Sequence, residues 1–251
     1  MDRIYGMLFT CFFILGVVSL VFSEVVELSS DNTDVEEAYI KRVIDGDTVV
    51  LEDGERVRLL GFDSEEEGEK CFEPATEYLK QILEGDGVEL VHQGERNRDY
   101  YGRLLRYIVQ DGRNINKKMV KGGHGVVVLG DESDEYIKKM IEAEKHAWKN
   151  KAGCLWDERE VKNVCDAENF IGEWRVFEGN IHEIYDFETG FFLNFGAEYP
   201  DNCFSAVIWD EKVFERIELK EEAEIKLHGR VETYRERPQI VVDRESQIMI
   251  K

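Results

Sequence analysis

Short runs of β-branched and apolar residues, separated by charged and glycine-containing stretches, occur through the first half of this chain and predict strands. Two of them, residues 48–51 (TVVL) and 56–60 (RVRLL), flank the acidic stretch 52–55 (EDGE), which contains the Asp-Gly pair typical of hairpin turns. Further strands are predicted at residues 88–91 and 104–109. The pattern therefore predicts an antiparallel hairpin and additional strands after it.

Helical spacing of apolar residues appears between and after these strands. Residues 74–83 (PATEYLKQIL) begin with a proline, which is favoured in the first turn of a helix. A short helix is predicted at residues 116–121 and a longer one at 132–149. The longer helix has a mostly apolar stripe, which we expect to pack against the core. The stripe consists of Tyr136, Ile137, Met140, Ile141, Ala143, Glu144 and Ala147.

The pattern changes to strands alone after residue 170. Segments of strand character are predicted at residues 174–184, 191–195, 204–208, 224–233 and 240–250. Glycines stand at the turns or bends, at Gly179, Gly190, Gly196 and Gly229. Several short strands with glycines between them predict a second small β-barrel.

The amino-terminal residues 7–22 are almost wholly apolar and follow a single basic residue, Arg3. The run is shorter than the ~20 residues of a membrane-spanning helix and fits a secretory signal that ends in small residues near position 23. An uncleaved membrane anchor is the alternative for residues 1–23, because the segment before the apolar run also contains Asp2. Either interpretation places the protein outside the cell or on the outer face of its membrane.

The length of 251 residues suits one large or two small domains. Residues 24–37 are acidic and lack periodicity, so we expect a linker there. A first domain is predicted at residues 38–156, a charged linker at 157–170 and a second domain at 171–251.

The predicted hairpin also brings acidic residues together. An antiparallel pair places the start of one strand beside the end of the other, so we expect Asp47 and Asp63 at one end of the ribbon. Two carboxylates that close repel unless a cation lies between them, and hard oxygen ligands favour Ca²⁺ or Mg²⁺. Glu66 follows within reach of a water, and Arg58 offers a planar set of donors that suits a phosphate. These four residues predict a phosphodiesterase site, although residues 45–47 alone would indicate an ordinary turn.

A further motif, residues 98–107 (RDYYGRLLRY), follows DGDT at 45–48 and RLLGFD at 58–63. Together these motifs resemble the staphylococcal nuclease (thermonuclease) family, over roughly residues 37–156. The resemblance implies a mainly β fold with packed helices (α+β), built on a five-stranded OB-fold barrel. It also implies Ca²⁺-dependent hydrolysis of DNA and RNA that leaves 3′-phosphate ends.

The resemblance also implies roles for individual residues. Asp47 and Asp63 correspond to the family's metal carboxylates, and Ser64 to a threonine whose backbone carbonyl completes the metal site. Glu66 corresponds to the acid that activates or orients the water. Arg58 and Arg103 correspond to the two phosphate-binding arginines, and Tyr101 corresponds to a substrate-contacting tyrosine.

Three positions depart from the family pattern. Glu65 replaces a usual proline, Tyr100 replaces a frequent lysine, and residues 126–129 lack the aromatics that stack on a base. The metal and arginine chemistry is therefore expected to be kept, and the grip on base and phosphate to be altered.

Charge and cysteines bear on where the protein works. The formal net charge of −22 disfavours tight non-specific binding of nucleic acid, so a nuclease needs basic residues clustered at its site. Four of the five cysteines lie beyond residue 23, and an even count in an exported chain suggests disulfides with three alternative full pairings. The family resemblance favours the pair Cys71–Cys154. No zinc site is expected, because the chain has no CxxC motif and its histidines are scattered.

The second half resembles nucleic-acid-binding OB domains at residues 190–196 and 229–240. OB barrels often present aromatic and basic residues to single strands, and Tyr234, Arg235 and Arg237 are the candidates here. The sequence thus predicts an exported Ca²⁺-dependent nuclease with an appended OB-like domain, a DNA or RNA substrate and no protein partner. The alternatives are a catalytically degenerate nucleic-acid-binding protein and a cell-surface interaction protein.

Overall fold

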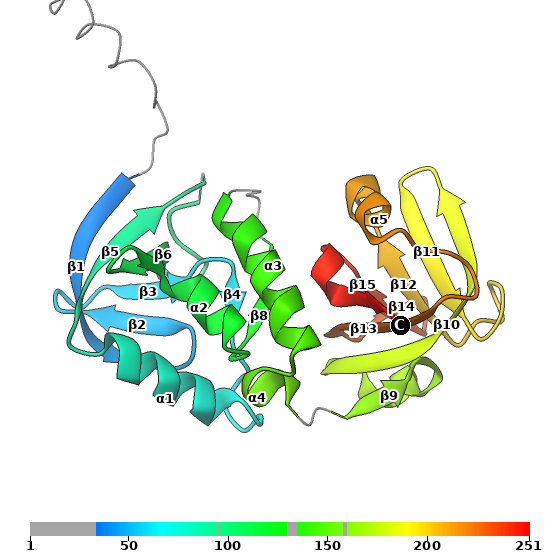
Figure 1. Ribbon diagram of the computed structural model, residues 1–251, viewed down its shortest axis with the longest axis horizontal. Helices are drawn as coiled ribbons and strands as arrows, with labels where there is room; N and C mark the ends of the chain where they lie inside the picture. Colours follow the sequence, from blue (N-terminus) through cyan, green and yellow to red (C-terminus); the bar gives the residue numbers. More distant parts are fainter. Residues whose placement is uncertain (1–33, 95, 130–134, 158–159) are drawn as a thin grey trace, which may run out of the picture. The chain divides into compact units, whose positions relative to one another are not determined.

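The computed structural model describes residues 34–251 except for residue 95, residues 130–134 and residues 158–159 (Figure 1). The predicted signal or anchor, residues 1–23, lies outside the described residues, as do residues 24–33 of the predicted linker. Within the described part of the chain, no helix is both long and apolar enough to cross a membrane.

A closed barrel of five strands forms the first half. Neighbouring strands pair antiparallel in the order β3-β2-β1-β5-β6, and a parallel ladder between β3 and β6 closes the ring. The strands are β1 (Asp34–Val43), β2 (Thr48–Leu51), β3 (Arg56–Leu59), β5 (Gly87–His92) and β6 (Leu104–Gln110). Shorter pairs are β4 (Phe62–Asp63) with β8 (Val126–Val127), and β7 (Arg113–Asn114) with β6. The predicted hairpin and mainly β fold with packed helices are confirmed.

Helices pack on this barrel through apolar faces. They are α1 (Phe72–Leu83), α2 (Ile115–Lys121) and α3 (Glu135–Lys149). The short helix α4 (Gly153–Trp156) instead belongs to a separate apolar cluster with the last turn of α3. Asn116 at the start of α2 is fully buried, and its amide accepts from the Ile108 backbone N–H at 3.0 Å and donates to the Leu60 carbonyl at 2.9 Å. Because a buried amide without partners is costly, these bonds fix α2 against the barrel.

Among the described residues, the second half consists of one sheet, one α-helix and two 3-10 segments. The path of the sheet is β14-β15-β12-β11-β10-β13-β16, and β9 pairs with β10. Its strands are β9 (Val161–Asn163), β10 (Trp174–Phe187), β11 (Gly190–Phe195), β12 (Phe204–Ile208), β13 (Glu224–Arg230), β14 (Glu232–Tyr234), β15 (Arg237–Val241) and β16 (Ile248–Ile250). The helical segments are η1 (Val164–Phe170), α5 (Glu211–Ile217) and η2 (Glu245–Gln247).

The strand order of the second sheet repeats part of the first. β10, β11 and β12 pair antiparallel in sequence, β13 returns to β10, and β15 pairs parallel with β12, as β6 does with β3. No ladder joins β13 to β15 among the described residues, whereas β5 and β6 are paired in the first half. The sheet therefore has the strand order that an OB-like domain requires, but the closed second barrel that the sequence predicts is not shown.

Both predicted linkers need correction. The first was expected to continue to residue 37, but β1 begins at Asp34, and residues 34–39 pair with 92–87 of β5. The second was expected at residues 157–170, but β9 pairs with β10, and Val164 and Ala167 of η1 belong to the second core. Most described charged residues of these two segments face solvent, which gives each segment the composition of a linker. Backbone pairing stabilises the first, and backbone pairing with a few small buried apolar side chains stabilises the second.

Two disulfides join segments that are distant in the sequence. Cys71, just before α1, pairs with Cys154 in α4, with 5.4 Å between their Cα atoms, and this is the pair that the family resemblance favours. Cys165 pairs with Cys203 within the second half, with 5.1 Å between Cα atoms. Two disulfides are consistent with an extracellular location.

We expect non-reducing peptide mapping of the purified protein to recover these two linked peptides. Replacing both Cys71 and Cys154 by alanine should lower the free energy of unfolding by about 4 kcal/mol, because the bond closes a loop between residues 83 positions apart. Urea denaturation under non-reducing conditions measures this change. Recovery of the four cysteines as free thiols, or in crossed pairs, would contradict the assignment.

A buried ion pair joins α3 to the end of the chain. Glu144 is fully buried, and its carboxylate accepts from the Arg244 guanidinium at 2.8 and 3.1 Å, from the Ser246 hydroxyl and from the Val127 backbone N–H at 2.8 Å. Burial raises the pKa of Glu144, but the charge and hydrogen bonds of Arg244 outweigh it, so that the pKa lies below its usual value. Both halves of the chain accordingly belong to one unit, Asp34–Lys251.

Candidate active site

The open end of the β2–β3 hairpin places two acids on one arginine. Thr48 is opposite Arg58 in the β2–β3 ladder, so Asp47 before β2 lies beside the end of β3. Arg58 binds Asp47 Oδ2 through Nη1 at 2.7 Å and Asp63 Oδ1 through Nη2. The two acids therefore lie at one end of the hairpin, as the pattern predicted, and Arg58, which was expected to bind a phosphate, contacts both of them.

Asp47 is held in a tight, buried loop. Its Oδ1 accepts from the Thr48 hydroxyl at 2.7 Å, and its Oδ2 is 3.4 Å from both the backbone N and the hydroxyl of Ser64. A Cβ at Gly46 would lie 2.7 Å from the Ser64 Cβ and 2.8 Å from the Ala75 Cβ. Only glycine fits here, because the loop passes so close to Ser64 and the first helix.

Negative charge is concentrated in this loop. Burial raises the pKa of Asp63; the ion pair with Arg58 lowers it only in part, and the charge of Asp47 adds to the rise. Burial, and then the charge of Asp47, also raises the pKa of the half-buried Asp45, whose Oδ1 accepts from the Asp47 backbone N–H at 3.0 Å. Asp45 was expected only as part of a turn, and its electrostatic coupling to Asp47 was not predicted.

The donor set fits a hard divalent cation. One cationic group, the Arg58 guanidinium, already contacts carboxylate oxygens of both Asp47 and Asp63. A cation near both acids would relieve the repulsion that raises the pKa of Asp63. Among the described residues no group of three or more His, Cys, Asp or Glu side chains could hold a metal together. Any divalent cation held here would therefore have no more than two side-chain carboxylates as protein ligands, and backbone carbonyls or waters would have to complete its coordination.

Arg103 is linked to Asp47 through the Thr48 hydroxyl. Its Nη1 donates to the Thr48 hydroxyl at 3.1 Å, and that hydroxyl donates to Asp47. Its Nε donates to Asp99 Oδ2 at 2.6 Å, and Asp99 Oδ1 accepts from the backbone N–H groups of Arg103 and Tyr101, both at 2.9 Å. Burial raises the pKa of Asp99, but the bonds from Arg103 hold it below its usual value. Asp99 therefore orients Arg103. The sequence analysis included Asp99 in the 98–107 motif but did not predict this role.

Tyr101 and Glu66 lie outside this network within the described residues. Tyr101 is 81% exposed, and the Arg103 guanidinium carbon lies 5.5 Å from its ring centroid. Glu66 is exposed on the loop after Asp63, and its backbone N–H donates to the Glu69 carboxylate at 2.7 Å. Both side chains thus face solvent; Glu66 follows Asp63 closely in the sequence, and Tyr101 follows Asp99.

The neighbouring Glu65 has a different environment. Its carboxylate accepts from the Cys71 backbone N–H at 2.7 Å, at the start of α1. This position satisfies one of the backbone donors that a helix leaves free at its N-terminus. Glu65 is therefore bound to the helix start, whereas the carboxylate of Glu66 is exposed to water.

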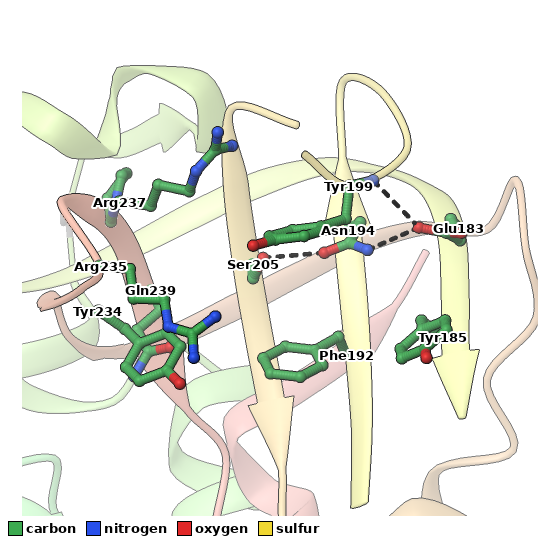
Figure 2. A pocket seen from close by; sticks show the side chains of 11 residues that line it. Glu183, Tyr185, Phe192, Asn194, Tyr199, Ser205, Tyr234, Arg235, Arg237 and Gln239 are labelled. Atoms are coloured by element: carbon green, nitrogen blue, oxygen red, sulfur yellow. Dashed lines mark hydrogen bonds between the residues drawn. The ribbon is translucent and has the colours of Figure 1, made fainter. Parts of the chain in front are cut away.

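Tyr234, Arg235 and Arg237 of the second half lie together at a different place. They line a pocket over β10, β11 and β12, together with residues of those strands (Figure 2). The structure thus gathers the three predicted strand-binding residues.

Known proteins are similar in sequence to the segment of this chain that contains the candidate site. The sequence model described as "Staphylococcal nuclease homologue" matches residues 56–158, which include Arg58, Asp63, Glu66 and Arg103. The chain is 32% identical over 157 residues to a thermonuclease of Staphylococcus intermedius, covering 57% of this chain and 92% of that protein. An uncharacterized protein of Bacillus anthracis is 32% identical over 162 residues, with 55% and 74% covered. Endonuclease YncB of Bacillus subtilis (strain 168) is 29% identical over 127 residues, with 47% and 60% covered.

Proposed function

This chain belongs to the staphylococcal nuclease family, and we propose that it is a calcium-dependent nuclease that leaves 3′-phosphate ends on DNA, RNA or both. Its nuclease relatives support the broader assignment as a phosphodiester hydrolase whose substrate is a nucleic acid. The observation that carries the proposal is Arg58 bound to both Asp47 and Asp63, with Arg103 joined to Asp47 through Thr48.

We assign the ion to the carboxylates of Asp47 and Asp63 and the backbone carbonyl of Ser64. Nucleases of this family are generally metal-dependent, and an all-oxygen ligand set with flexible coordination suits Ca²⁺. A bound divalent cation supplies Lewis acidity toward the phosphoryl oxygens and favours deprotonation of the attacking water.

The other polar residues act on the water and the phosphoryl group. We assign Glu66, whose carboxylate is exposed to solvent, to accept the proton of the attacking water. Arg58 and Arg103 stabilise the charge that develops on the phosphoryl oxygens, and Arg58 exchanges one of its carboxylate contacts for an oxygen of the substrate. Tyr101, exposed beside Arg103, contacts the substrate next to the scissile bond.

We assign the second half to gripping single strands and residues 1–23 to export or membrane anchoring. The grip is supported by the pocket that Tyr234, Arg235 and Arg237 line. A secreted or membrane-attached location is supported by the two disulfides.

Incubation of the purified protein with plasmid and single-stranded DNA, in Ca²⁺ or in a chelator, tests the proposal. We expect cleavage of both substrates in Ca²⁺ and none in chelator. Binding to DNA without cleavage would identify a catalytically degenerate binding protein instead. Neither binding nor cleavage would favour a cell-surface interaction protein.

Replacing Arg103 by lysine tests the geometry of the phosphate grip. Arg103 bonds Asp99 and Thr48 through two different nitrogens, and a single ammonium group does not reproduce this planar arrangement. We expect kcat to fall on the order of 100-fold, as for the loss of one donor to a developing oxyanion. Arg216→Lys, on an exposed arginine of α5, is the control and should retain full activity. Full activity in Arg103→Lys would show that the assigned substrate geometry is wrong.

A further inference from the structure

A pocket of about 380 Å³ opens on the sheet of the second half, between strands β10 to β12 and the hairpin of β14 and β15 (Figure 2). Small-molecule sites typically measure about 300–1,000 Å³. The pocket is therefore large enough for one small planar group with its substituents, and too small for a duplex.

The polar part of the pocket is a prearranged network. Asn194 is buried; its amide N–H₂ donates to the Glu183 carboxylate at 2.7 Å, and its carbonyl accepts from the Ser205 hydroxyl at 2.9 Å and from Asn202 at 3.3 Å (Figure 2). The Glu183 carboxylate also accepts from the Tyr199 backbone N–H at 3.4 Å. Glu183 and Ser205 both line the pocket, and the Ser205 hydroxyl also accepts from the Asn202 amide at 2.8 Å. The two groups therefore offer acceptors to the donors on the polar edge of a ligand.

Aromatic rings form the remaining walls. Tyr185, Tyr199 and Tyr234 line the pocket although each is at least half exposed, at 54%, 60% and 50%. Phe192 is fixed from behind by stacking on Phe187, with 4.7 Å between ring centroids. Rings that are exposed at a pocket and not used in a core offer faces on which a planar ligand can stack.

Two arginines determine the charge of the ligand. The Arg235 guanidinium lies 5.2 Å from the Tyr234 ring centroid, and that of Arg237 lies 5.6 Å from the Tyr199 centroid. Arg237 also donates to the Asn202 carbonyl at 3.3 Å. With two guanidinium groups and one carboxylate, that of Glu183, among its lining residues, the pocket carries a net positive charge in a chain of net charge −22, which favours an anionic ligand.

The turn that carries Arg235 has an unusual backbone. Arg235 and Glu236 both have positive φ, 48° and 66°, in the two-residue connection between β14 and β15. Such turns strongly prefer asparagine or glycine, because other side chains are strained there. Strained residues of this kind concentrate at ligand sites, and here the turn holds a guanidinium at the mouth of the pocket.

We propose that this pocket binds one unpaired nucleobase of a single-stranded nucleic acid, with Arg235 bonded to the adjacent phosphate. A base supplies the planar face for the tyrosines and the polar edge for Glu183 and Ser205, and its phosphate supplies the negative charge. The inference rests on the proposed nuclease function, because it identifies the substrate contact of the second half. The pocket lies apart in sequence from every catalytic residue assigned above.

Fluorescence anisotropy of a labelled single-stranded decanucleotide, measured in chelator with the full-length Glu66→Gln protein, tests the proposal. Adding Tyr234→Ala should weaken binding on the order of 10-fold, the typical effect of losing one stacked base contact. Adding Arg235→Gly should weaken it on the order of 10-fold as well, through the loss of a charge-assisted bond to the phosphate. Glycine at position 235 suits the positive φ, so this variant removes the guanidinium and keeps the turn. Tyr39→Ala on β1 and Arg216→Ala on α5 remove an exposed tyrosine and an exposed arginine elsewhere, and should bind as the parent protein does.

Photocrosslinking adds a readout that does not depend on affinity. An oligonucleotide that contains 5-bromodeoxyuridine should crosslink to peptides of Tyr199 or Tyr234. Unchanged affinity in both pocket variants, or crosslinks found only in residues 38–156, would overturn the proposal and leave the nuclease assignment intact. Loss of binding to heparin in these variants, with oligonucleotide binding unchanged, would overturn it in favour of an anionic polysaccharide. Crosslinking at the pocket in a protein that cleaves no nucleic acid would reject the proposed function alone.

Discussion

Replacing Glu66 by glutamine should abolish most cleavage and leave Ca²⁺ binding in place. The amide is nearly isosteric, but it cannot accept the proton of the attacking water, and loss of a general base typically costs ~10²–10⁴ in rate. Ca²⁺ affinity should persist, because the assigned ligands are Asp47, Asp63 and the Ser64 carbonyl. Single-turnover cleavage of a labelled oligonucleotide and calorimetric titration with Ca²⁺ measure the two effects separately.

Glu65→Gln is the matched control for this experiment. Glu65 accepts from the Cys71 backbone N–H at the start of α1, and the glutamine carbonyl can still accept this bond. The replacement should therefore cost at most about 1 kcal/mol of stability, for the charge lost near the helix start, and leave the rate nearly unchanged. The opposite pattern, with Glu65→Gln inactive and Glu66→Gln active, would show that the residues after Asp63 are assigned in the wrong register. The pair of variants therefore decides the role of the glutamate that replaces the family's usual proline.

Replacing Arg244 by methionine should destabilise the whole protein by about 3–5 kcal/mol, because it leaves the buried Glu144 carboxylate without its cation. Glu144 also accepts from the backbone N–H of Val127, and β8 pairs with β4, which contains Asp63. We therefore expect the loss to extend to the active site, although Arg244 itself is in the second half. The midpoint of urea denaturation, followed by tryptophan fluorescence, measures the change.

Two further variants separate charge from packing. In Glu144→Gln/Arg244→Met the glutamine carbonyl can still accept a hydrogen bond, and no buried charge remains, so the double variant should be more stable than Arg244→Met alone. Arg216→Met removes an exposed ion pair with Glu245 and should change stability by less than about 1 kcal/mol. An Arg244→Met protein as stable as the parent would show that the buried pair does not couple the two halves.

The centre of the active site could be predicted from local sequence. A strand, a short turn with Asp-Gly and a second strand determine the register of a hairpin, and that register fixes which ends meet. This register places Asp47 and Asp63 at one end of the hairpin, as the pattern predicted, whereas the contact of Arg58 with both acids was not predicted. The roles beyond that geometry came from the family resemblance, since spacing does not distinguish a metal ligand from a solvated acid.

Residues that depend on distant partners could not be predicted in this way. Glu144 was included in an apolar stripe of its helix, and it is indeed buried, but its cation is 100 residues further along the chain. Asp99 belonged to a recognised motif, yet its function as the partner of Arg103 depends on how the 98–103 loop folds back on itself. Both cases involve tertiary contacts that no local periodicity records.

The sequence predicted most strand-forming segments of the second half but not all of their limits, nor the helix among them. Residues 224–233 contain parts of two strands, because β13 pairs with β10 whereas β14 pairs with β15. The helix α5 was not expected, although Asp210 caps it by accepting from the Lys212 backbone N–H at 2.8 Å, and Val213 and Ile217 are buried. Seven residues with two buried positions give too short a pattern for helical periodicity to be recognised.

Mass spectrometry of the products from a defined single-stranded oligonucleotide, at increasing Ca²⁺, tests the central claim most directly. The account predicts products with 3′-phosphate ends that appear only with Ca²⁺, from the parent protein and not from Asp47→Asn or Asp63→Asn at the same ion concentration. Cleavage that persists in chelator, or that survives in both asparagine variants, would contradict the assignment of the two carboxylates that Arg58 holds together.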